Sequence, residues 1–66
     1  MRILLNGQPL DLPRAMDVAD LLAHLQLGGK RVAVEVNRAI VPRSAHAGHR
    51  LCEGDSVELV QAMGGG

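Results

Sequence analysis

The chain has 66 residues, seven Lys or Arg against seven Asp or Glu, and a 47% hydrophobic composition without any Phe, Tyr or Trp. A domain of this size buries a modest share of its surface and has no room for a deep cleft, which argues against a self-sufficient enzyme. Balanced charge and the lack of aromatic stacking platforms give no basis for nucleic-acid or membrane partners.

The N-terminal segment predicts a β-hairpin. An apolar run at residues 2–5 stops at Asn6-Gly7, a pair that tolerates the positive φ angles of a tight type I′ turn. Residues 8–12 form the returning strand. Pro9 lies inside it and cannot donate a ladder hydrogen bond, so we expect this strand at an edge of the sheet.

One amphipathic helix is predicted after the hairpin. Asp17 has the position and side chain of an N-cap, and Asp20 in the first turn favours the positive end of the helix dipole. The apolar positions repeat at the spacing of a single helical face: Val18, Leu21, Leu22 and Leu25. The pair Gly28-Gly29 is expected to end the helix.

Three extended segments follow the helix. Residues 32–36 alternate with period two, residues 39–41 form a short piece, and residues 56–62 form the last strand after a Glu-Gly-Asp turn. In the last strand we expect Val57 and Leu59 to face the helix, while Glu58, Val60 and Ala62 face away.

The order of these elements indicates the fold. One helix with one apolar face must bury it on one face of a mixed sheet. Placing the last strand beside the first gives a ubiquitin-like β-grasp fold of the α+β class, with four to five strands packed on the helix. We expect one domain over residues 1–63 and a flexible glycine tail over residues 64–66.

The three terminal glycines carry the chemistry. Such a run gives a fold no stability, but a backbone without Cβ atoms can enter a narrow channel in another protein. Once adenylated, a terminal carboxylate can be attacked by a sulfur or amine nucleophile, with acids, bases and Mg²⁺ supplied by the partner. We predict covalent modification at Gly66 and recognition of Gly64 and Gly65, rather than a tail without function.

Over its whole length the sequence resembles the ThiS family, the sulfur carriers of thiamine biosynthesis. The resemblance rests on residues 1–7, on residues 34–43 with their Val-x-Val-Asn and Val-Pro-Arg patterns, and on residues 51–66 with the Glu-Gly-Asp turn and the Gly-Gly end. The related small subunit of molybdopterin synthase usually approaches its glycines through prolines. Residues 60–63 read Val-Gln-Ala-Met here, which favours the thiamine branch.

The resemblance implies a reaction sequence. An adenylyltransferase of the ubiquitin-activating type would use ATP and Mg²⁺ to adenylate the Gly66 carboxylate. Sulfur from a cysteine desulfurase persulfide would replace AMP, and thiazole synthase would take sulfur from the resulting thiocarboxylate. The chain would bind no cofactor itself and would be a recycled co-substrate, not an enzyme.

The other reactive side chains are given structural roles. Cys52 is interpreted as a small apolar filler, and a lone cysteine fits a cytoplasmic protein. His46 and His49 have the spacing of metal ligands but lack a second ligand pair, so we expect them on the surface, without metal.

Val60 and Met63 are the candidate docking residues. An outward Val60 near the tail could be gripped by partners together with Met63, or it could be an isolated surface valine. Two other functions stay open: a carrier or ubiquitin-like modifier serving molybdopterin or another pathway, and a noncovalent β-grasp interaction module.

Overall fold

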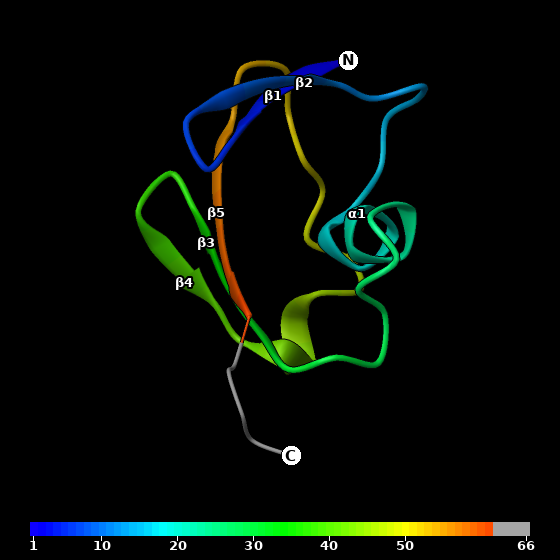
Figure 1. Ribbon diagram of the computed structural model, residues 1–66, viewed down its shortest axis with the longest axis vertical. Helices are drawn as coiled ribbons and strands as arrows, with labels where there is room; N and C mark the ends of the chain where they lie inside the picture. Colours follow the sequence, from blue (N-terminus) through cyan, green and yellow to red (C-terminus); the bar gives the residue numbers. More distant parts are fainter. Residues whose placement is uncertain (62–66) are drawn as a thin grey trace.

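The computed structural model describes residues 1–61 as a five-stranded mixed sheet that curves around one helix (Figure 1). The elements in chain order are β1 (Arg2–Leu5), β2 (Gln8–Asp11), α1 (Val18–His24), β3 (Val32–Val36), β4 (Ala39–Val41), the 3-10 turn η1 (Arg43–Ala45) and β5 (Ser56–Gln61). The predictions for residues 62–66, including the glycine tail, lie outside the described residues.

The order across the sheet is β2-β1-β5-β3-β4. The last strand, β5, lies at the centre, parallel to β1 and antiparallel to β3. The predicted architecture of one helix on a mixed sheet, with the last strand beside the first, is therefore confirmed. Strand β2 is at an edge, as Pro9 predicted, and Asn6 and Gly7 both have positive φ angles, 50° and 82°.

The helix begins where the sequence predicted it. Asp17 is the N-cap, and its Oδ1 accepts from the Asp20 backbone N–H at 2.7 Å. The Asp20 side chain accepts in turn from the Asp17 N–H at 3.2 Å, which completes a capping box. The backbone N–H groups of Asp17 and Asp20 are thereby satisfied by carboxylates, and those of Val18 and Ala19 donate to the backbone C=O groups of His49 and His46.

The predicted end of the helix was wrong. The helix stops at His24, and Gln26 takes a left-handed conformation with φ 62°. The Leu27 N–H donates to the Leu22 C=O at 2.7 Å and the Gln26 N–H to the Ala23 C=O at 3.0 Å, the two bonds of a Schellman motif. The partly buried Leu27 packs against the core, so the chain turns in before it reaches Gly28.

The core lies between α1 and the inner face of the sheet. Its buried members are Ile3, Leu12, Met16, Val18, Leu21, Leu22, Val34, Val36, Val41, Leu51 and Val57. Val57, at the start of the central strand, has no exposed surface. The alternation predicted for the last strand is confirmed within the described residues, because Glu58 and Val60 are exposed whereas Val57 is buried.

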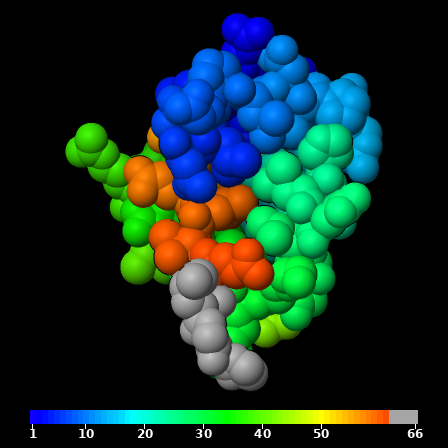
Figure 2. Space-filling model, viewed as in Figure 1, coloured from blue at the N-terminus to red at the C-terminus, as the bar shows by residue number. Residues whose placement is uncertain are grey.

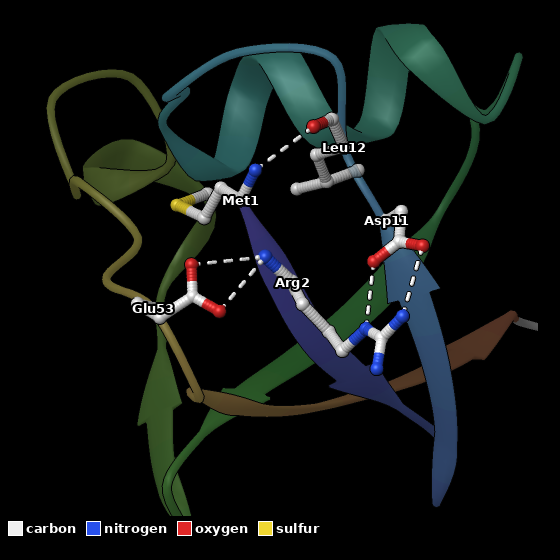
Figure 3. A network of polar contacts seen from close by, with 5 residues as sticks. All are labelled: Met1, Arg2, Asp11, Leu12 and Glu53. Carbon is white, nitrogen blue, oxygen red and sulfur yellow. Dashed lines mark hydrogen bonds and ion pairs between the residues drawn. The ribbon is translucent and has the colours of Figure 1, made fainter.

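A polar network lies where β1 begins and β2 ends (Figure 3). The Arg2 guanidinium binds Asp11 through Nε and Oδ1 at 2.7 Å, and the Arg2 backbone N–H donates to the Glu53 carboxylate at 3.1 Å. The Met1 amino group donates to the Leu12 C=O at 3.1 Å. The hydrogen bond from Arg2 lowers the pKa of the Asp11 carboxyl.

Asp17 also ties the start of α1 to the loop that follows η1. Its Oδ2 accepts from the Gly48 N–H at 3.0 Å, and the Val18 N–H donates to the His49 C=O at 3.0 Å. The hydrogen bonds from the backbone of Asp20 and then Gly48 lower the pKa of Asp17 below its ordinary value of 3.8. The ionised carboxylate is the form that holds these two segments together.

We expect Asp17→Asn to weaken the pH dependence of stability. The pKa of Asp17 is lower in the folded chain, so its contribution is present above the unfolded value of 3.8 and is lost as the pH falls through the folded pKa. Melting temperatures are measured by circular dichroism from about pH 6 to about pH 3. At about pH 6 the melting temperature of this variant should be a few degrees below that of the wild type, and it should fall less steeply as the pH is lowered. Asp11→Asn, which removes an exposed ion pair, is the control with little effect on melting at neutral pH. Parallel pH profiles for Asp17→Asn and the wild type would contradict this assignment.

Candidate functional site

The central strand leads to the glycines that the sequence analysis singled out. β5 ends the described part of the chain at Gln61, and Met63, Gly64, Gly65 and Gly66 lie beyond it. Figure 2 shows the atoms of β5 at the surface between those of the N-terminal hairpin and those of the helical segment. The fold thus presents the strand that precedes the tail at the middle of the sheet.

Two asparagines hold β5 at its two ends. The Leu59 N–H donates to Asn6 Oδ1 at 2.8 Å, and Asn6 Nδ2 donates to the Leu59 C=O at 3.3 Å. At the start of the strand the Ser56 N–H donates to Asn37 Oδ1 at 3.0 Å. Asn6 was predicted only as a turn residue, and its left-handed φ angle of 50° agrees with that role. Asn37 has a similar φ angle, 52°, and the side-chain partners of both asparagines were missed.

The outer face of the sheet, away from α1, carries exposed apolar side chains. Val60 is 67% exposed, as predicted, Ile40 is 76% exposed and Leu4 is 39% exposed. We call these three residues the apolar outer face. Ile40 was predicted only as part of a short strand. In the sheet it pairs with Glu35 of β3, and Glu35 pairs with Glu58 of β5, so the three side chains lie on the same outer face.

The predicted burial of two side chains, Cys52 and His46, was wrong. Cys52 is exposed and does not fill the core, and the neighbouring Leu51 is the buried residue. The Cys52 backbone N–H donates to Asp55 Oδ2 at 2.8 Å. His46 is only 9% exposed, and its Nε2 lies 3.1 Å from the Val41 C=O, so a backbone carbonyl satisfies a ring that was expected on the surface. His49 is half-buried.

Within residues 1–61, no three His, Cys, Asp or Glu side chains are grouped as they would be to hold a metal ion. In the same part of the chain, no helix has the length and apolar character needed to span a membrane.

The sequence model of the ThiS family matches residues 3–66. The chain belongs to the ThiS family. It is 35% identical to the sulfur carrier protein ThiS of Escherichia coli over 66 residues, which cover all of both chains. The crystal structure of the thiamine biosynthesis protein ThiS from Geobacter metallireducens superposes with a TM-score of 0.84 at 32% identity, again over the full length of both. The ubiquitin-like β-grasp fold predicted from the sequence is thereby confirmed.

A second kind of relative contains a ThiS-like segment within a longer chain. The thiazole synthase of Paramagnetospirillum magneticum is 38% identical to this chain over 66 residues. The match covers all of this ThiS-family chain but only 20% of that protein. The chain therefore spans about a fifth of the length of its thiazole synthase relatives.

Proposed function

We propose that this ThiS-family protein carries sulfur for thiazole formation in thiamine biosynthesis, with the Gly66 carboxyl as the reacting group. The observation that supports this most is the full-length correspondence with the E. coli sulfur carrier protein ThiS. The described fold agrees with a carrier, because it places the strand before the glycines at the centre of the sheet and exposes Leu4, Ile40 and Val60 on the outer face, beside Glu35 and Glu58. The protein works in the cytoplasm as a recycled co-substrate.

The proposed chemistry takes place in the partners. An adenylyltransferase of the ubiquitin-activating type binds ATP and Mg²⁺, joins AMP to the Gly66 carboxylate and releases pyrophosphate. The terminal sulfur of a persulfide, made by a cysteine desulfurase, then attacks the carbonyl carbon and displaces AMP. A second thiol attacks the desulfurase cysteine sulfur of the resulting acyl disulfide, so that a disulfide forms between these two sulfurs and the thiocarboxylate is released. This anionic sulfur is a nucleophile at neutral pH and stays tethered to the carrier.

Thiazole synthase is the proposed acceptor of the sulfur. Two proteins named thiazole synthase, from P. magneticum and Magnetococcus marinus, contain a segment 38% identical to the whole of this chain. Joining a carrier to its acceptor in one polypeptide raises their effective concentration, which supports a direct encounter between the two when they are separate.

Partner docking is proposed at the apolar outer face, together with Met63 and the recognised glycines Gly64 and Gly65. Exposed apolar side chains on one sheet face are typical of protein interfaces. Val60 belongs to β5, the strand that precedes the glycine tail. A partner that binds Val60 therefore also brings the tail close to its catalytic channel.

Val60→Asp is expected to raise the KM for the adenylyltransferase by about tenfold, because it places a charge at the centre of the docking face. Unfolding stability should fall by about 1 kcal/mol or less, since the Val60 side chain is largely exposed but lies in the central strand, where aspartate is disfavoured. Ala47→Asp, an exposed residue in the loop after η1, is the matched control and should leave the KM unchanged. An unchanged KM for Val60→Asp would remove Val60 from the interface.

The proposed function is tested by the intact mass of the protein after incubation with the adenylyltransferase, ATP, Mg²⁺, the desulfurase and cysteine. We expect the mass to rise by the difference between sulfur and oxygen, and the product to support thiazole formation by purified thiazole synthase. A product that instead supplies molybdopterin synthase would assign the carrier to that pathway. A protein that acquires no sulfur would contradict the carrier function.

A further inference from the structure

The end of β5 is held in different ways on its two sides. On one side residues 57–61 pair with β3. On the other side the parallel ladder with β1 stops at the pair Leu5–Val57, because the chain turns at the next residue, Asn6. Beyond this point the described contacts on the β1 side come from Asn6: its backbone N–H donates to the Val57 C=O at 2.9 Å, and its side chain binds Leu59.

The Asn6 side chain takes the place of a strand residue. Its Oδ1 accepts from the Leu59 N–H and its Nδ2 donates to the Leu59 C=O, the two backbone groups that a neighbouring strand would use. Figure 2 shows the N-terminal hairpin directly against β5. The ladder is thus extended by one more residue of β5 through a side chain 53 residues away in the sequence.

Packing holds this end of the strand only weakly. Val57 is fully buried, but Leu59 is only partly buried and Gln61 is exposed. A groove between β5 and the segment after α1 is lined by Asn6, Leu59 and Gln61 among others. Backbone hydrogen bonds, more than core packing, therefore determine the course of β5 after Val57.

We propose that Asn6 is a positioning residue for the carrier reaction, because it fixes the course of β5 at Leu59, two residues before the end of the strand at Gln61. This inference rests on the proposed function. Without the Asn6 amide, the end of β5 is held on the β3 side alone and can pivot about that edge. Docking through the apolar outer face is retained, but fewer docked complexes place the Gly66 carboxyl at the partner's catalytic centre.

Asn6→Gly tests the contact directly. Glycine adopts a φ angle of 50° without strain, so the hairpin turn is kept while the amide is lost. Asn37→Gly is the matched control, because Asn37 has the same backbone conformation and its side chain binds Ser56 at the start of β5. By hydrogen exchange we expect the Leu59 amide to exchange at least about tenfold faster in Asn6→Gly only, and the Ser56 amide to respond to Asn37→Gly only.

The functional readout is pyrophosphate exchange catalysed by the purified adenylyltransferase, measured against carrier concentration. Asn6→Gly should lower kcat by about three- to tenfold with KM changed by less than about twofold, whereas Asn37→Gly should change neither. Asn6→Asp keeps an acceptor for the Leu59 N–H but loses the donor, so its kcat should be intermediate. Partial unfolding would instead reduce the active concentration in proportion to the folded fraction, which circular dichroism measures.

Three results would overturn the inference. A Leu59 amide that stays protected in Asn6→Gly would show that Asn6 does not hold it. A wild-type kcat with an unprotected Leu59 amide would show that the contact does not position the tail. A wild-type carrier that is never adenylated would contradict the proposed function, and with it the role in catalysis, while the exchange data would still measure the contact.

Discussion

Deleting Gly66 is expected to lower the rate of adenylation by at least about 100-fold, because catalysis depends on placing the reacting carbon within about 1 Å of its optimum. One residue of extended chain spans about 3.5 Å, so the shortened tail presents its carboxyl outside the range that the partner's catalytic groups can reach. The three glycines are identical, so removing any one of them gives the same shortened chain. The rate is measured by pyrophosphate exchange with the adenylyltransferase.

Two variants of unchanged length separate the effect of tail length from the effect of adding a side chain to a tail glycine. Gly64→Ala keeps the full length and the Gly-Gly end, and we expect adenylation within about threefold of the wild type. Gly66→Ala keeps the length but adds a Cβ beside the reacting carboxyl, and we expect a loss similar to that of the deletion. If the deleted chain is adenylated as fast as the wild type, the new terminal carboxyl reacts equally well, and the expected dependence on the length of the tail and on Gly66 fails.

Ile3→Ala is expected to unfold a large part of the population. Ile3 is fully buried in the core, and truncating such a side chain to alanine costs about 2–5 kcal/mol. The core of a domain this small supplies about 3–5 kcal/mol of net stability, so little or none would remain. Urea unfolding should be followed by far-ultraviolet circular dichroism, because the chain has no aromatic residue to report by fluorescence.

The neighbouring Leu4 provides the matched control. It lies on the same strand but on the opposite face of the sheet and is 39% exposed. Leu4→Ala should lower the stability by about 1 kcal/mol or less. Equal unfolding midpoints for Ile3→Ala and Leu4→Ala would contradict the assignment of the two faces.

Local backbone preferences made much of the fold predictable from sequence. Asn6-Gly7 predicted the hairpin turn, Pro9 the edge strand and Asp17 the start of the helix, and all three were confirmed. Each depends on the conformation or hydrogen-bonding capacity of a few adjacent residues, which the sequence states directly. The alternation around Val57 and Val60 was predictable for the same reason, since successive side chains of a strand face opposite sides.

The surroundings of side chains that meet distant segments required the tertiary structure. The burial of His46, the exposure of Cys52 and the exposure of Ile40 depend on which segment packs against each of them. The contact of Asn6 with Leu59 joins residues 53 positions apart, and a turn asparagine has the same local pattern with or without it.

The sequence by itself therefore determined the order of the elements, the family and the candidate reacting residue, Gly66. Only the tertiary structure decided how the strand before the tail is held, because that depends on the register between β5 and the hairpin. Turns and helix caps depend on a few neighbouring residues, whereas the partners of a side chain depend on the topology of the whole sheet.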